Sequence, residues 1–256
     1  MNNYQKLYDS KRESFTAYHK ISTKPNNKLG LIFLGGFKSD MNGTKALAIN
    51  AYAERNNYDL IRFDYFGHGN SSGDFTDGSI DIWLKNTLRV IDELTDKPQI
   101  LIGSSMGGWL MLLAAMARPH RVAGLVGLAA APDFTEELIW DYMTSTQKEK
   151  ILKDKIIDFS NEFCEDSYPI SHKLIEESRQ HLLLSKKLAL EMPIHLIHGM
   201  EDKDVPYKVA IRIAEAVSSN NVKIHLLKGA GHRLSEPNEL EFIYQIITSA
   251  INECSH

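Results

Sequence analysis

A short apolar segment, a tight turn and a helix-forming segment follow one another between residues 99 and 117. The turn reads Gly103-Ser-Ser-Met-Gly107, and the helix-forming segment begins directly after it at Trp109. A serine at the centre of G-x-S-x-G between a strand and a helix occupies a strained turn, so the flanking residues must be very small. Ser105 is in this frame, whereas Ser104 would need glycine where Ile102 and Met106 stand. The pattern predicts Ser105 as a nucleophile at the end of a buried strand.

Apolar strand-like segments alternate with helical segments along most of the chain. We expect strands at 15–21, 29–34, 58–64, 99–103, 122–130, 193–199 and 222–228, and helices at 44–56, 79–94, 109–117, 208–217 and 236–254. This alternation predicts an α/β fold with a mostly parallel sheet flanked by helices.

One stretch interrupts the alternation. Residues 133–191 are rich in Glu and Lys and contain helical stretches but no convincing strand. We therefore expect a core domain built from residues 1–132 and 192–256. Residues 133–191 would form a helical lid between the strands at 122–130 and 193–199, which are the sixth and seventh in the usual order of such a fold.

Composition excludes some classes of protein. The chain has 256 residues and a net charge of −4, without the basic excess that nucleic-acid binding needs. Cys164 and Cys254 suggest no disulfide framework. We see no signal peptide and no integral membrane segment, and we expect a cytoplasmic protein.

A serine nucleophile needs a histidine base within hydrogen-bond reach, and that histidine needs an orienting acid. The loop after the next-to-last predicted strand carries Asp202, and the loop after the last one carries His232. Because carboxyl ends of parallel strands meet at one edge of a sheet, we predict Asp202 as the acid and His232 as the base. The alternatives for the acid are Glu201, Asp204 and Asp133.

Other histidines fit structural or surface positions. They lie in strands, in a glycine-rich loop, in the predicted lid or on the surface: His195, His198, His225, His68, His172, His181 and His120. None forms a metal-binding spacing beside an acid, so we expect no metal and no cofactor.

Acyl transfer also needs two backbone N–H groups that bind the oxyanion. One is expected from Met106, the residue after the nucleophile. The other is expected from Phe37, because Gly35-Gly36 gives the backbone room to turn after the strand at 29–34.

Three motifs in this order carry a resemblance to a known superfamily. With Gly103-Ser-Ser-Met-Gly-Gly108, His198-Gly-x-x-Asp202 and Gly231-His232, the chain resembles the α/β-hydrolases over nearly its whole length. The segment from Asp64 to Ser71 is similar to the D-x-x-G-x-G-x-S loop of that superfamily. The resemblance implies a structural role for this loop in bracing the turn around Ser105.

A narrower resemblance is visible in the first half of the chain. The segments at 37–48, 61–65 and 103–111 resemble the mitochondrial acyl-protein thioesterases, which are also described as acyl-glucuronide esterases and have bacterial relatives. This implies removal of fatty acyl groups from cysteine thioesters and hydrolysis of acyl-glucuronide esters. The substrate would be a small-molecule ester or an acylated protein. No transit peptide precedes the fold, so we do not expect the mitochondrial address to carry over.

We expect a serine hydrolase that works through an acyl-enzyme. The alternatives are a carboxylesterase of short-chain small-molecule esters, a cofactor-free haloperoxidase and a non-catalytic binding protein. The acyl chain would lie under the lid, against Gly36, Trp140, Tyr142 and Leu183, with Met143, Leu182 and Leu184 as further candidates. Packing of the lid on the core would explain each of these lid side chains equally well.

Overall fold

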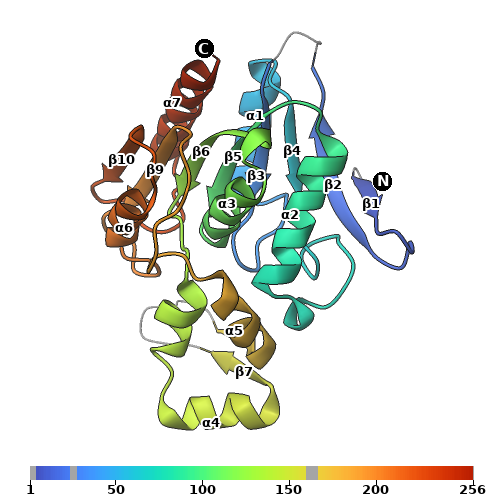
Figure 1. Cartoon of the computed structure of the whole chain (residues 1–256), viewed down its shortest axis with the longest axis vertical. Coiled ribbons are helices and arrows are strands. Elements are labelled where there is room, and N and C mark those ends of the chain that lie inside the picture. The colour runs from blue at the N-terminus through green and yellow to red at the C-terminus, as the bar shows by residue number, and fades with distance from the viewer. Residues whose placement is uncertain (1–3, 24–27, 160–166, 256) are drawn as a thin grey trace.

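Eight strands form one mostly parallel sheet in this computed structural model, which describes residues 4–23, 28–159 and 167–255. Cys164 and residues 24–27 lie outside the described residues. The strand order is β1-β2-β4-β3-β5-β6-β9-β10, and only β1 and β2 run antiparallel to their neighbours (Figure 1). The strands are β1 (Gln5–Tyr8), β2 (Phe15–Ile21), β3 (Gly30–Leu34), β4 (Leu60–Phe63), β5 (Gln99–Ser104), β6 (Val122–Leu128), β9 (Ile194–Gly199) and β10 (Val222–Leu227).

Helices cover both faces of this sheet, as the strand and helix alternation predicts. One face carries α2 (Ile80–Leu94), α3 (Met106–Ala117) and α6 (Lys208–Ala216), and the other carries α1 (Thr44–Arg55) and α7 (Pro237–Cys254). Short 3-10 turns, η1 (Phe75–Asp77) and η2 (Pro119–Arg121), join some of these elements. The predicted fold class is therefore confirmed.

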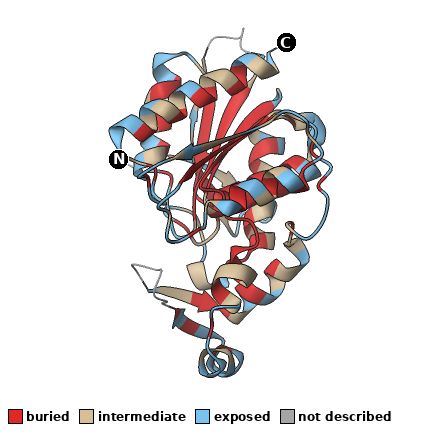
Figure 2. Ribbon diagram, turned by 90° about the vertical axis from the view of Figure 1, so that its left-hand side faces the viewer, coloured by how far each residue is buried: buried red, intermediate tan, exposed pale blue. Residues whose placement is uncertain are grey.

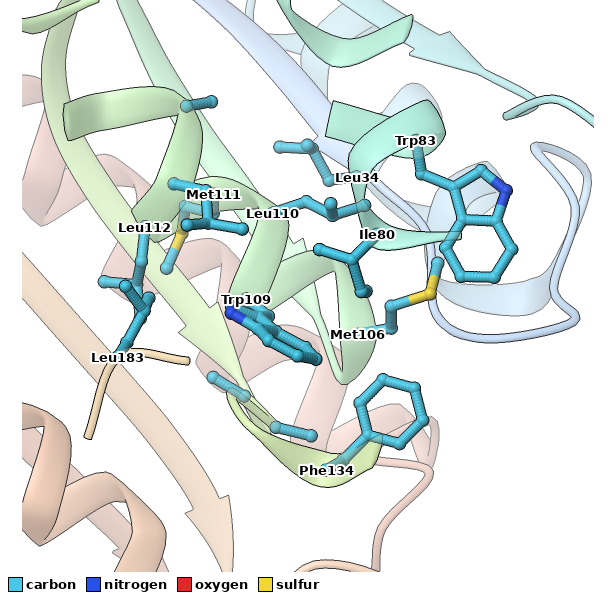
Figure 3. Packing of buried hydrophobic residues seen from close by; sticks show 14 of the residues in the cluster. Leu34, Ile80, Trp83, Met106, Trp109, Leu110, Met111, Leu112, Phe134 and Leu183 are labelled. Atoms are coloured by element: carbon cyan, nitrogen blue, oxygen red, sulfur yellow. The ribbon is translucent and has the colours of Figure 1, made fainter. Parts of the chain in front are cut away.

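The core lies on the two faces of the central strands, which are buried along their whole length (Figure 2). Alternate residues of each strand point to opposite faces, so Leu196 packs with α3 and α6 whereas Ile197 packs with α7. Trp109 of α3 is fully buried and meets Phe134 with ring centroids 5.8 Å apart (Figure 3). Its indole N–H donates to the His181 carbonyl at 3.0 Å, which ties the inserted segment to the core.

The inserted segment, residues 133–191, projects beyond the carboxyl ends of the central strands (Figure 1). It contains η3 (Thr135–Trp140, a π-helix), α4 (Ser145–Asp154), α5 (His172–Ser178) and η4 (Arg179–His181). The expectation that it holds no strand is wrong, because β7 (Ile156–Phe159) and β8 (Tyr168–Ser171) pair antiparallel. Both strands have only four residues and β8 contains Pro169, so neither shows an alternation of apolar and polar residues long enough to predict a strand.

No helix in residues 4–23, 28–159 and 167–255 has the length and apolar character needed to cross a membrane.

Candidate active site

Ser105 lies at the junction of β5 and α3 in a conformation that side chains seldom adopt, with φ 54° and ψ −118°. Three backbone hydrogen bonds hold it there. Its N–H donates to the Leu128 carbonyl at 2.9 Å, and its own carbonyl accepts from Gly108 at 2.8 Å and Ala131 at 3.0 Å. The strain is thus maintained by the neighbouring strand β6 and the segment that follows it.

Glycines make this turn possible, as the motif predicts. A Cβ on Gly107 would lie 2.2 Å from the Leu34 carbonyl oxygen, and a Cβ on Gly103 would lie 2.4 Å from the Gly107 carbonyl oxygen. Both contacts are with backbone, which cannot move aside. The start of α3 can therefore approach β3 and β5 only with glycine at these positions.

His232 connects Ser105 to a carboxylate from another loop. Its Nε2 lies 3.0 Å from Ser105 Oγ, and its Nδ1 lies 2.8 Å from Asp202 Oδ2. The structure thus brings together the three side chains that were predicted from the ends of β5, β9 and β10. A serine, a histidine and an acid linked in this order can activate the serine hydroxyl.

The Asp202 carboxylate is fully buried and receives four hydrogen bonds. Oδ2 accepts from His232 and from His198 Nε2 at 3.0 Å, while Oδ1 accepts from the N–H groups of Val205 at 2.8 Å and Asp204 at 3.0 Å. Burial alone would raise the pKa of Asp202, but the hydrogen bonds from His198 and His232 outweigh it and hold the pKa well below its usual range. Asp202 is therefore ionised throughout the neutral range.

The alternative acids occupy other places. Glu201 and Asp204 are exposed. Asp133 is buried and accepts the N–H groups of Leu183 and Leu184, each at 2.8 Å, so it joins the two ends of the inserted segment. Among the described residues, Asp202, Asp204 and His232 form the one group close enough to hold a metal ion, and two of them already bond each other.

A cavity of about 550 Å³ opens onto Ser105 and His232. Residues of the core contribute one part of its wall, including Gly36, Phe37 and Met106. The inserted segment contributes an apolar part: Phe134, Leu138, Ile139, Tyr142, Phe159, Tyr168 and Ile170. Its volume is within the range of about 300–1,000 Å³ that is typical of small-molecule sites.

The predicted acyl-binding residues divide into two groups. Gly36 and Tyr142 line the cavity, whereas Trp140, Leu183, Leu182, Leu184 and Met143 are not among the described residues that line it. Trp140 instead lies against the cations of Lys148 and Arg179, and Leu183 is buried in the core near Trp109 (Figure 3). Helical spacing alone could not distinguish a wall residue from a packing residue here.

One predicted oxyanion donor follows Ser105 directly in the chain, and the other belongs to the loop after β3. Met106 is the first residue of α3, so its N–H has no partner within the helix. Gly36 lies so close to the nucleophile that a Cβ there would be 3.4 Å from Ser105 Cβ, which places the Gly36-Phe37 backbone beside the serine. The Phe37 ring anchors this loop, with centroids 4.9 Å from Phe75 and 5.5 Å from Phe134.

The loop from Asp64 to Ser71 makes hydrogen bonds to the segment that follows β3. Asp64 accepts the N–H of Met41 at 2.6 Å and that of Asn70 at 2.8 Å. His68 Nε2 accepts the N–H of Lys38 at 3.2 Å. The loop therefore braces residues 35–41, which carry Phe37 and lie beside the turn around Ser105.

Three cationic residues also line the cavity: Lys45, Lys203 and Arg233, alongside the carboxylates of Asp202 and Asp204. Lys45 donates from Nζ to the Arg233 carbonyl, next to His232. Burial lowers the pKa of Lys45 to about 8, although Glu239 and Asp202 act in the opposite direction. Sequence reasoning missed Lys45, because nothing in the spacing of α1 indicates that its first turn faces the site.

A mostly parallel eight-stranded sheet with a strained serine between β5 and α3 defines an α/β hydrolase. The family model for the alpha/beta hydrolase fold matches residues 31–162, just over half of the chain, and the chain belongs to this family. It is 38% identical to the palmitoyl-protein thioesterase ABHD10 of Bos taurus over 240 residues, which covers 93% of this chain and 77% of the relative. The human protein of the same name is 37% identical over the same shares.

A solved structure agrees with these relatives. Alpha/beta hydrolase domain-containing protein 10 from mouse matches with a TM-score of 0.89 and 31% identity, covering 97% of this chain and 98% of the other. The narrower resemblance, which the sequence shows mainly in its first half, is thus confirmed over most of the chain. The protein is a hydrolytic enzyme that acts on ester or thioester bonds.

The comparisons correct one prediction. We expected a cytoplasmic protein, but the cattle and human relatives are mitochondrial by name. This finding overturns the cytoplasmic assignment.

Proposed function

We propose that the chain is a serine hydrolase that releases fatty acyl groups from thioesters through an acyl-enzyme. Ser105 is the nucleophile, His232 the base and Asp202 the orienting acid. The hydrogen-bonded chain from Ser105 Oγ through His232 to Asp202, with distances of 3.0 and 2.8 Å, is the observation that carries the proposal.

Acyl transfer proceeds in two steps. Ser105 Oγ attacks the carbonyl carbon while His232 Nε2 takes its proton, and the oxyanion binds the N–H groups of Phe37 and Met106. The carbon–sulfur bond then breaks, and His232 returns the proton to the leaving thiol. Water, deprotonated by His232, attacks the acyl-enzyme and releases the fatty acid and Ser105.

The cavity supports an acyl chain as the part of the substrate that is retained. The inserted segment supplies seven apolar or aromatic wall residues, and we propose that it acts as the lid over that chain. The names of the cattle and human relatives support a palmitoyl-type thioester on a protein as the substrate class.

Acyl-glucuronide esters are a second candidate substrate. Their leaving group carries a carboxylate, and the cations Lys45, Lys203 and Arg233 are among the residues that line the cavity. Opposite charges in a partly buried cavity attract more strongly than in water.

The deciding experiment measures turnover of acyl thioesters and oxygen esters from two to sixteen carbons by the wild type and by Ser105→Ala. We expect the variant to lose on the order of 10⁶-fold in turnover, as in other serine hydrolases that lose the nucleophile. A Ser105→Ala protein with most of its activity would refute the assignment. A preference for short oxygen esters would instead favour a small-molecule carboxylesterase.

Covalent labelling separates the remaining alternatives. A fluorophosphonate should label Ser105 in the wild type and leave Ser105→Ala unlabelled. An unlabelled wild type would favour a non-catalytic binding protein. Labelling combined with halide oxidation and no ester hydrolysis would favour a haloperoxidase.

A further inference from the structure

A second histidine lies behind the proposed acid. His198 is next to last in β9 and its side chain is 1% exposed. Its Nε2 lies 3.0 Å from Asp202 Oδ2 and 2.9 Å from the Val205 carbonyl oxygen. Both oxygens only accept hydrogen bonds, so Nε2 carries the ring proton and donates to both. The other ring nitrogen, Nδ1, is buried and has no hydrogen-bond partner in the described part of the chain.

This contact completes the shell around the carboxylate. Asp202 Oδ2 receives one imidazole N–H from His232 and one from His198, and Oδ1 receives two backbone N–H groups. A carboxylate offers about four lone-pair sites, so all of them are occupied. The carboxylate is held in a single orientation, with Oδ2 directed at His232.

We propose that His198 is a positioning residue for acyl transfer, which fixes Asp202 Oδ2 and shares its negative charge between two imidazoles. The inference rests on the proposed function, in which Asp202 orients His232. Without His198, Oδ2 would keep only the imidazole N–H of His232, so the carboxylate would be held less firmly and its charge would no longer be shared between two imidazoles. We therefore expect the acid limb of the pH–rate profile to move to higher pH when His198 is lost, because the remaining ion pair would favour the charged imidazole.

The acid side of the pH profile can report this effect. The charged groups around His232 are Asp202, Lys203 and Asp204 from the loop after β9, Lys45 from α1 and Arg233 from its own loop. Of these groups, only Asp202 is hydrogen-bonded to His198 in the described part of the chain, so a change in the acid limb would report on Asp202. Lys45 titrates near pH 8, on the alkaline side of the profile.

Three substitutions at His198 test the proposal. His198→Phe keeps a ring but removes the donor. His198→Gln places its amide nitrogen the same number of bonds from Cβ as the imidazole Nε2, and so retains the donor. His198→Asn has the same amide one bond shorter.

The matched control is His195→Phe. His195 lies in the same strand and is 1% exposed, but it points to the other face of the sheet, where its Nε2 is 3.2 Å from Glu253. Hydrolysis of p-nitrophenyl octanoate by the full chain between pH 5 and 9 gives kcat, KM and the acid limb, and thermal unfolding is recorded for each variant.

We expect His198→Phe to lower kcat about tenfold, as for the loss of one hydrogen bond to a charged group, with KM within about twofold. The acid limb should move up by about half a pH unit. His198→Gln should restore both values, and His195→Phe should change neither. If His198→Phe does not fold, the Gln and Asn variants decide. The proposal is supported if kcat of His198→Gln is close to that of the wild type and kcat of His198→Asn is much lower.

Two results would overturn it. One is a wild-type pH profile and kcat in His198→Phe. The other is an equal loss of activity in the Phe, Gln and Asn variants, which indicates a general packing role. Ser105→Ala in the same assay keeps the two proposals apart, because an active Ser105→Ala refutes the triad itself. If Ser105→Ala is inactive and His198→Phe has wild-type activity, only the role of His198 is refuted.

Discussion

At the scale of single residues, Lys45 is a cation of the cavity wall whose charge should change between pH 7 and 9. Burial lowers its pKa to about 8, so it is protonated below that pH and loses its charge as the pH rises through it. Any preference for a substrate with an anionic leaving group should therefore be largest below pH 8 and decline above it. Neutral substrates should not show this decline.

The measurement is kcat/KM for two esters of the same acid, one with a carboxylate on the leaving group and one without, between pH 6 and 9.5. At pH 7, Lys45→Met should reduce the ratio of kcat/KM for the ester with the carboxylate to kcat/KM for the ester without it. Lys153→Met, on the exposed surface of α4, should leave this ratio unchanged. If this ratio changes neither with pH nor in Lys45→Met, esters with an anionic leaving group are ruled out as proposed substrates.

Gly107 tests the close approach of α3 to β3. In open space, alanine would favour a helix over glycine by about 1 kcal/mol. Here the added Cβ would lie 2.2 Å from the Leu34 carbonyl oxygen, so Gly107→Ala should lower the free energy of unfolding by about 2–3 kcal/mol. Gly231→Ala is the control, because nothing lies within 4 Å of its Cβ position. Urea denaturation of both variants gives the comparison, and an unaffected Gly107→Ala would contradict the model of the turn.

His198 shows where single-residue reasoning from the sequence ends. The predicted nucleophile, acid and base follow from strand ends that share one edge, and the structure brings all three together. His198 stands four residues before Asp202, but a histidine within an apolar strand is equally typical of a core residue. The turn after β9 directs Asp202 back toward its own strand. The four-residue spacing brings His198 into contact with Asp202 only because of this turn, which the sequence does not show.

At the scale of elements, the buried strands were predictable because their apolar runs are long and uninterrupted. The strands missed are β1, β7 and β8, which have four residues each and lie at an edge or in the inserted segment. In such short segments pairing with a neighbouring strand, and not the residue pattern, decides the conformation.

The loop at 64–71 is the element on which the predicted oxyanion donor depends. In Asp64→Asn, one of the two N–H groups from Met41 and Asn70 would face an amide donor in place of an acceptor. The free energy of unfolding should fall by about 1–3 kcal/mol. Because Met41 and Phe37 belong to the same braced loop, kcat should fall more than KM changes. Asp74→Asn, an exposed acid between β4 and α2, is the control, and an equal loss in both variants would refute the bracing role.

At the scale of the whole molecule, the cavity is a joint product of the core and the inserted segment. The core supplies Ser105 and His232, while the β7–β8 hairpin supplies Phe159, Tyr168 and Ile170. This division predicts that the chemistry and the acyl-length preference can be changed separately. The hairpin should determine how much of the chain fits, because it contributes wall residues and none of the proposed catalytic ones.

Ile170→Phe enlarges a wall residue that is 1% exposed, without altering the core. Since the larger ring takes up space inside the cavity, we expect kcat/KM for sixteen-carbon thioesters to fall at least about tenfold, equivalent to about 1.4 kcal/mol. Two-carbon and four-carbon thioesters should be cleaved within twofold of the wild type. Leu174→Phe, buried in α5 of the same segment but not among the wall residues, controls for general disturbance. An equal loss across all chain lengths in Ile170→Phe would mean that the acyl chain does not lie against the hairpin, and the substrate would then have to occupy the core side of the cavity alone.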